Sequence, residues 1–281
     1  VQESREALQG GFIPVLTVKR ILKHLLLGIA RLHECGIAHT GIHQTRQHHG
    51  GHWTNDAIDN WVMQNPPRTY APERSLNKMV SVFVSQSFPP PSLDELSSCN
   101  FKLADFSNAQ FVSDQTTDDI TPLGLRPPEV VLGGEWNESV DIWTFGCLLL
   151  LLMVNRDTYM SKIFTLLTNR PLFKPMVSEI DNASEIDVLI LQMILFCGEF
   201  FHEDFLKRCP RSLEYFQPDC RPRKFESFVR KPFEKCISDT GCILSSADMA
   251  GVTDLMSKCL RIDPKNRSTA QELLRHPWLM A

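Results

Sequence analysis

Apolar residues recur at helical spacing along much of the chain. In residues 17–35, Ile21, Leu25 and Ile29 fall on one helical face, and Thr17 is the expected N-cap. The same periodicity predicts further helices at residues 56–64, 141–153, 186–196, 248–260 and 269–275. The pattern therefore favours a helical protein.

Two of these predicted helices carry additional signals. Residues 141–153 are apolar nearly all round, which is typical of a helix buried in a core. In residues 269–275, Thr269 and Glu272 have the spacing of a capping box, and Pro277 is expected to end the helix.

Strand-like alternation is limited to residues 79–84 and residues 101–104. Residues 41–100 are rich in His, Gln, Gly and Pro, and we expect this insert-containing segment to be mostly irregular. The predicted fold class is mainly α with a few short strands. We expect one domain over residues 1–281, with its core in residues 17–279.

Composition narrows the class of protein. The chain is 43% hydrophobic and 22% charged, which is ordinary for a globular domain. A net charge of −4 argues against a nucleic-acid-binding surface, which would be basic. The longest apolar run, residues 147–154, is far shorter than the roughly 20 residues that cross a bilayer, so we expect no membrane association.

The cysteines indicate a compartment. No two of the nine have C-x-x-C spacing, and the number is odd. Scattered cysteines of this kind are typical of reduced thiols in an intracellular protein, cytoplasmic or nuclear.

Five short motifs occur in a fixed order, and each alone would be a weak signal. They are Leu32-His33 followed by Ile37-Ala38-His39-Thr40, then Leu103-Ala104-Asp105-Phe106-Ser107-Asn108-Ala109, Leu125-Arg126-Pro127-Pro128-Glu129-Val130, Ser139-Val140-Asp141-Ile142-Trp143-Thr144-Phe145-Gly146-Cys147, and Asp263-Pro264-Lys265-Asn266-Arg267 closing with His276-Pro277-Trp278-Leu279.

Together these motifs resemble the signature set of the eukaryotic protein kinases, in the order catalytic loop, metal-binding turn, substrate-side loop, core helix and closing arginine motif. The His39-Thr40 form of the catalytic loop and the residues 126–129 look most like the SR-protein kinase group and its fungal relatives. The resemblance implies a protein-kinase-like large, C-terminal lobe. We expect the small lobe to be absent, because no glycine-rich loop precedes Thr17.

The resemblance also implies roles for individual residues. Asp105 would hold the Mg²⁺ that bridges the phosphates of ATP, so Mg²⁺ and ATP are the implied cofactors. Glu129 and Arg267 would form a buried ion pair, Asp141 would brace the catalytic loop, and Trp143 would fill the space beneath it. The alternative for the charged residues is ordinary helix capping or surface charge.

The residues that would perform phosphotransfer are not intact. Gly41 stands where the family has its catalytic aspartate, and glycine cannot accept a proton. His43 and Arg46 lie where a lysine and a Mg²⁺-binding asparagine are expected, while His39 remains. Ser107 replaces a glycine, which is a milder change. Since losing a general base typically costs about 10²- to 10⁴-fold in rate, we expect this chain to be inactive.

Residues 42–50 admit other interpretations. Their degenerate codons, read in a shifted frame, can encode Lys-Pro-Asp-Asn-Ile-Met, which the family carries in its catalytic loop. The segment is therefore a frame-shifted catalytic loop, in a decaying gene or an erroneous gene model, or simply a His-rich solvated loop. A metal site of His43, His48, His49 and His52 is a further alternative, but no cysteine or carboxylate stands at ligand spacing.

Three functions follow from these observations. The chain is a pseudokinase-type lobe that binds basic Arg/Ser-rich protein segments, a fragmentary or frame-shifted record of an active Ser/Thr kinase, or a relic without function. The acidic residues that would attract a basic partner are Glu179, Asp181, Glu185, Asp187, Glu199, Glu203 and Asp204.

Overall fold

The computed structural model describes residues 13–41, 45–48, 55–84, 97–98, 100–152, 172–179 and 181–281. These residues are mainly helical with a few short strands, which confirms the predicted class. The elements in chain order are α2 (Val15–Glu34), β1 (Ile37–Ala38), β2 (Thr45–His48), α3 (Asn55–Gln64), β3 (Glu73–Ser75), β4 (Lys78–Val80), β5 (Asn100–Leu103), η1 (Phe106–Asn108), β6 (Gln110–Phe111), η2 (Leu123–Leu125), α5 (Pro128–Val131), α6 (Ser139–Leu152), α8 (Glu185–Cys197), α9 (Glu203–Leu206), α10 (Ser212–Tyr215), α11 (Phe233–Ser238), α12 (Ser246–Cys259), η3 (Pro264–Asn266), α13 (Ala270–Leu274) and α14 (Pro277–Met280).

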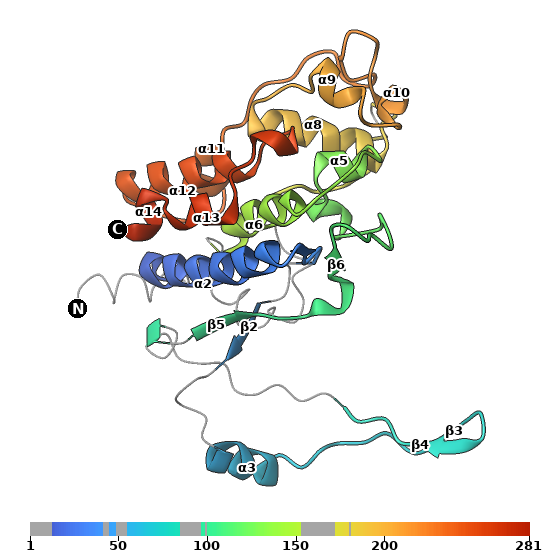
Figure 1. Ribbon diagram of the computed structural model, residues 1–281, viewed down its shortest axis with the longest axis vertical. Helices are drawn as coiled ribbons and strands as arrows, with labels where there is room; N and C mark the ends of the chain where they lie inside the picture. The colour runs from blue at the N-terminus through green and yellow to red at the C-terminus, as the bar shows by residue number, and fades with distance from the viewer. Residues whose placement is uncertain are drawn as a thin grey trace. The chain divides into compact units, whose positions relative to one another are not determined.

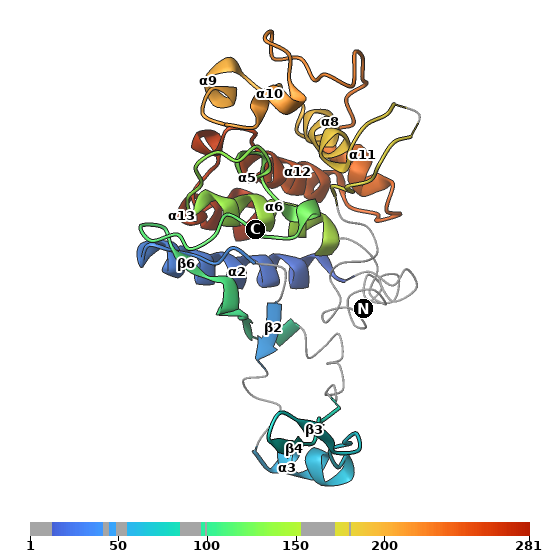
Figure 2. The ribbon, with the colours of Figure 1, turned by 90° about the vertical axis from the view of Figure 1, so that its right-hand side faces the viewer.

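The chain divides into two compact units, one made of residues up to 46 together with residues 101–281, and one made of residues 47–100. In the first unit α6 lies between α2 and α12, and α13 packs on α2 (Figures 1 and 2). The apolar face of α2 is completely buried at Ile21, Leu22 and Ile29. The periodicity of the sequence therefore identifies the face of α2 that enters the core.

Helix α6 is the central helix of this unit, in agreement with its apolar sequence. Trp143 is fully buried, and its ring stacks on Phe173 with 5.3 Å between the ring centroids. Gly146 allows α12 to approach closely, because a Cβ at this position would lie 2.8 Å from the Cβ of Cys259. Thus a glycine and an aromatic ring in the same helix fix the packing below the candidate site.

Short strands lie beside α2. β1 and β6 pair antiparallel, with Ile37 opposite Phe111 and Ala38 opposite Gln110. β2 and β5 form a second two-stranded sheet. The first pairing brings the loop after α2 next to the segment that follows Asp105, although the two are far apart in the sequence.

The second unit contains α3 and a hairpin. The helix predicted at residues 56–64 is α3, and β3 pairs antiparallel with β4 in register Arg74 opposite Met79. Strand β4 includes only Met79 and Val80 of the strand predicted at residues 79–84, it begins one residue earlier at Lys78, and its partner β3 was not predicted. The large side chains of Leu76 and Phe83 are exposed.

Two predicted helix ends differ from the structure. α2 begins at Val15 after Pro14, so Thr17 is a buried residue of the helix rather than its N-cap. Pro277 was expected to end the preceding helix, but α13 already ends at Leu274. Pro277 is instead the first residue of α14, where its missing N–H costs nothing. The capping box of Thr269 and Glu272 at the start of α13 is present as predicted.

The described cysteines are unpaired, and most of them are buried. Burial raises the pKa of the Cys209 thiol to about 12, so this side chain remains a neutral thiol. Among the described helices, none combines the length and the apolar character that a membrane crossing requires.

Candidate active site

Asp141 holds the loop that follows β1. It lies in the first turn of α6 and is completely buried. Its Oδ2 atom accepts a hydrogen bond from the backbone N–H of His39 (2.7 Å), and its Oδ1 atom accepts one from the N–H of Thr40 (2.9 Å). The Nε2 atom of His33 lies 3.0 Å from Oδ2. A buried carboxylate with this many donors is satisfied, so Asp141 has the bracing position that the resemblance implies.

The His39 side chain connects this loop to the strand β5. Its Nε2 atom lies 3.0 Å from the carbonyl oxygen of Ala104, which can only accept, so Nε2 carries the proton. Burial lowers the pKa of His39, although the nearby Asp141 carboxylate opposes the shift. The ring also contacts Phe106, with 5.1 Å between the ring centroids. His39 is therefore a neutral positioning residue in this arrangement.

Asp105 occupies a turn immediately after β5. Its φ angle of 68° is in the left-handed region, and its Oδ1 atom accepts a 2.8 Å hydrogen bond from the Ser107 hydroxyl. The Thr40 hydroxyl donates to the carbonyl oxygen of Asn108, so the turn is tied to the loop that Asp141 holds. Within the described part of the chain, His, Cys, Asp and Glu side chains form no group of three or more that could hold a metal ion. Asp105 supplies a carboxylate of the kind that Mg²⁺ prefers.

Gly41 follows directly after the two braced backbone groups. It is buried and has no side chain that could accept a proton. Arg46 belongs to β2, while His43, His49 and His52 lie outside the described residues. The backbone up to residue 40 is thus held in place, and the acid expected at the next residue is missing.

The segment after β6 is held by Gln110, which the sequence analysis did not single out, and by Arg126 of the third motif. The Gln110 Oε1 atom accepts from the N–H of Thr116 (2.6 Å) and of Thr117 (3.1 Å), and Nε2 donates to the carbonyl of Thr117. Arg126 donates to the carbonyl of Thr121 and pairs with Asp119. Gln110 lies six and seven residues before the two threonines, and no spacing rule in the sequence marks such a contact.

Glu129 and Arg267, which are 138 residues apart in the chain, form a bidentate ion pair with both N–O distances at 2.6 Å. Both side chains are buried. Arg267 also donates to the carbonyl oxygens of Ser139 and Arg261, and its guanidinium lies over the Trp143 ring at 5.1 Å. The pair therefore joins α5 to the loop after α12 through the start of α6.

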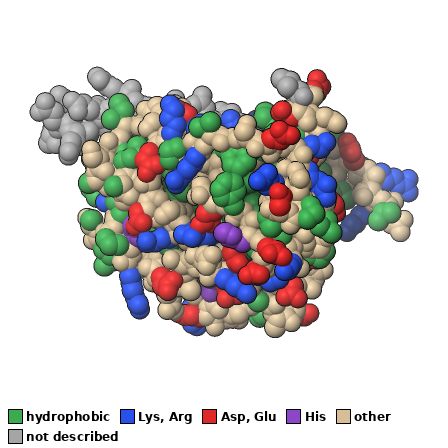
Figure 3. Space-filling model, turned by 90° about the horizontal axis from the view of Figure 1, so that it is seen from above, with side chains coloured by type: hydrophobic (Ala, Val, Ile, Leu, Met, Phe, Trp, Pro, Cys, Tyr) green, Lys and Arg blue, Asp and Glu red, His purple; other side chains and the backbone are tan. Residues whose placement is uncertain are grey.

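The acidic residues expected to attract a basic partner lie near α8 and α9. The end of the molecule seen in Figure 3 has acidic and basic side chains interspersed. Several of the predicted acidic residues have partners within the fold: Asp181 with Ser178, Asp187 with Ser184, Glu199 with Arg261, and Glu203 with Lys207. Asp187 therefore caps α8, Asp181 bonds within a loop, and Glu199 and Glu203 form ion pairs.

Comparison with known proteins places this geometry in a family. The protein kinase domain matches residues 93–279, which is more than half of the chain. The serine/threonine-protein kinase SKY1 of Saccharomyces cerevisiae is 29% identical over 178 residues, covering 63% of this chain and 22% of that protein. The dual specificity protein kinase lkh1 of Schizosaccharomyces pombe is 24% identical over 279 residues, covering 94% of this chain and 32% of that protein.

A third relative, the serine/threonine-protein kinase ppk5 of Schizosaccharomyces pombe, is 26% identical over 182 residues, covering 64% of this chain and 18% of that protein. The matched part of the chain thus spans between about a fifth and a third of the length of these relatives.

Proposed function

The chain belongs to the protein kinase domain family, and from this premise we propose that it forms the large lobe of a Ser/Thr-kinase-type domain whose phosphotransfer site is impaired. The observation that carries the proposal is at Gly41. The backbone N–H groups of His39 and Thr40 are bonded to Asp141, so the loop is positioned, but the next residue has no carboxylate.

The metal-binding position, Asp105, also supports an impaired phosphotransfer site. Asp105 has a carboxylate that would hold Mg²⁺, and the ion would supply charge stabilisation to the phosphates of ATP. Its Oδ1 atom already accepts from Ser107, and the described His, Cys, Asp and Glu side chains form no group of three or more that could hold a metal ion. A loop without a catalytic base favours very slow transfer.

A transfer assay tests this proposal. The chain is incubated with Mg²⁺ and radiolabelled ATP, with an Arg-Ser repeat peptide and myelin basic protein as acceptors. We expect incorporation no higher than that of the Asp105→Asn variant, because the base is missing in both. Robust incorporation that Asp105→Asn abolishes would show instead that the chain is an active kinase.

We further propose that the lobe acts by binding a partner protein, with basic Arg/Ser-rich segments as the partner class. The net charge of −4 and the exposed carboxylates of Glu179, Glu185 and Asp204 support this class. An Arg-Ser repeat peptide should bind more weakly as salt increases. Equal binding of a neutral Gln-Ser repeat peptide would count against the proposal.

A further inference from the structure

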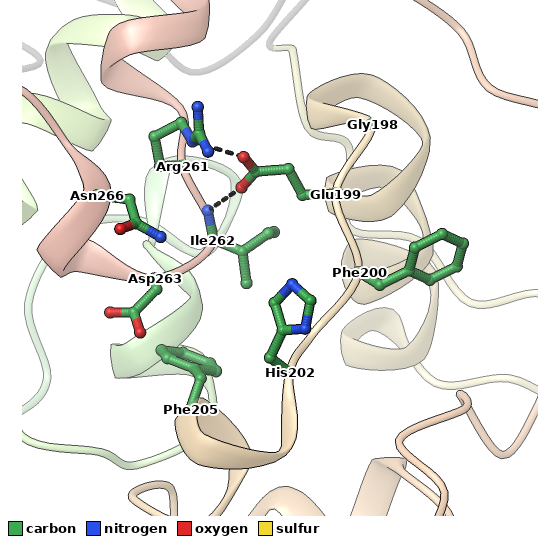
Figure 4. A pocket seen from close by; sticks show the side chains of 9 residues that line it. All are labelled: Gly198, Glu199, Phe200, His202, Phe205, Arg261, Ile262, Asp263 and Asn266. Atoms are coloured by element: carbon green, nitrogen blue, oxygen red, sulfur yellow. Dashed lines mark hydrogen bonds and ion pairs between the residues drawn. The ribbon is translucent and has the colours of Figure 1, made fainter.

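A pocket of about 290 Å³ lies at the end of the first unit, away from Asp105 and Gly41 in the sequence. It is formed by the loop that follows α8, by α9 and by the loop that follows α12 (Figure 4). Its lining includes Glu199, Phe200, His202, Phe205, Ile262 and Asn266.

The pocket is built on internal contacts rather than on loose side chains. The Glu199 carboxylate accepts from the backbone N–H of Ile262 (3.0 Å) and pairs with Arg261, as Figure 4 shows. Asp263 pairs with Arg208 at 2.6 Å and also accepts from the N–H of Lys265. These bonds fix the two loops relative to each other, so the pocket is preformed.

The charges of the pocket cancel. Two carboxylates, of Glu199 and Asp263, each have an arginine partner. The floor is apolar, because the side chains of Phe205 and Ile262 are almost completely buried there. An occupant with a net charge would leave one of these ion pairs incompletely matched, whereas a neutral apolar group would not.

Two further polar side chains, His202 and Asn266, face the same space. Figure 4 places the imidazole between Ile262 and Phe205 and the amide near Asp263. Among the described residues, neither side chain has a hydrogen-bond partner. Together they offer donors and acceptors to a neutral polar group such as a peptide amide.

The apolar surface continues outside the pocket. Phe200 is 59% exposed, and its ring contacts Phe228 with 5.8 Å between the centroids. The volume of the pocket suits one large side chain, and it is at the lower end of the range for small-molecule sites. A peptide can place one side chain in the pocket and contact the neighbouring rings of Phe200 and Phe228 with the next residue.

We propose that this pocket binds a short peptide segment of a partner protein through one aromatic side chain, with the adjacent peptide amides bonded to His202 and Asn266. The occupant is neutral at the point of contact because the ion pairs of the pocket are already complete. The pocket would bind the partner protein without bound nucleotide. This proposal therefore does not depend on whether the chain transfers phosphate.

The test uses N-acetyl-tryptophanamide, which carries an aromatic side chain between two amides. We expect it to shift the backbone amide resonances of His202, Ile262 and Asn266 in a saturable way in the ¹⁵N-labelled chain. Asn266→Trp fills the pocket from an exposed position and should weaken binding at least tenfold. His202→Ala should weaken it several-fold without filling the pocket. Leu213→Ala, a control at an exposed apolar residue outside the pocket, should leave binding unchanged.

Circular dichroism establishes that each variant is folded before binding is compared. Unsaturable shifts in the wild type, or equal binding by a folded Asn266→Trp variant, would overturn the proposal. So would equal or tighter binding of N-acetyl-argininamide, because the occupant would then be basic. Tighter binding of octyl glucoside at these resonances would assign the pocket to an alkyl chain of lipid type and would likewise overturn the peptide.

Discussion

The two regions on either side of Asp141 differ in which functional groups they contain. On the side of α5, α6 and the loop after α12, the buried charges of Glu129 and Arg267 are paired with each other. On the other side the braced loop leads to Gly41, which has no functional group. The difference teaches that the large lobe can be held together by residues that do no chemistry. We therefore expect the free energy of unfolding of the lobe to depend on its buried, paired charges. It should not depend on the residues that stand in the positions of the chemistry, Gly41 and Asp105.

The largest effect should come from Arg267→Met. Removing the guanidinium leaves the Glu129 carboxylate buried without a partner, and breaking a buried pair in this way costs about 3–5 kcal/mol. Urea unfolding followed by circular dichroism measures the loss. The double variant Glu129→Gln/Arg267→Met removes both charges and should recover part of the stability. If the single variant lost less than about 1 kcal/mol, the ion pair would not be what holds this side of the lobe together.

A smaller loss is expected for Asp141→Asn, which changes the brace itself. The amide of asparagine has one acceptor oxygen, so one of the N–H groups of His39 and Thr40 would face an NH₂ group. Losing one hydrogen bond to a charged acceptor should lower the free energy of unfolding of the variant by about 1.5–3 kcal/mol. Hydrogen exchange should accelerate at residues 39 and 40 in particular. Slow exchange at these two amides in the variant would contradict the bracing role.

The sequence was sufficient for the core and for the ordered motifs. Helical periodicity identified the buried face of α2, and the apolar helix at residues 141–153 identified α6. The resemblance to the protein kinases also implied that Glu129 and Arg267 would meet, which no local pattern of residues 138 apart could have indicated. The helices are recoverable because burial leaves a periodic trace in the sequence, whereas the ion pair was recoverable only through the resemblance.

Other features left no such trace. Gln110 holds Thr116 and Thr117 by backbone contacts, which any sequence with an amide at that position could make. The acidic residues near α8 read as a partner surface, but Asp187 caps its own helix and Glu199 pairs with Arg261. Local hydrogen bonds and surface ion pairs depend on three-dimensional proximity, so charge along the chain does not reveal them.

A pH dependence would sharpen the comparison at His39. Because burial lowers its pKa in the folded chain, the unfolded chain takes up a proton first as the pH falls. This contribution to stability is complete well above the ordinary histidine pKa of about 6.5, and it decreases as the pH falls below that value. For one proton, the free energy of unfolding changes by at most about 1.4 kcal/mol per pH unit in this window.

Unfolding in urea at pH 7.5 and at pH 5.5 measures this dependence. His39→Gln should reduce the difference between the two values. His24→Gln needs to be measured in parallel, because burial also lowers the pKa of His24, with Arg20 and Lys23 contributing, and its effect has the same sign. An undiminished pH difference in His39→Gln would show that other groups cause it.

The smallest effect is expected for Asp105→Asn, on the chemical side of the comparison. Asp105 is only half-buried, asparagine tolerates its φ of 68°, and the Ser107 hydroxyl can still donate to the remaining amide oxygen. We therefore expect a change in unfolding free energy within about 0.5 kcal/mol. Any stabilisation of the wild type by Mg²⁺ and ATP in thermal unfolding should disappear in the variant, since it would depend on this carboxylate. A loss of stability comparable to that of Asp141→Asn would mean that the metal-binding turn also supports the lobe, and the division between holding the fold and doing the chemistry would fail at this residue.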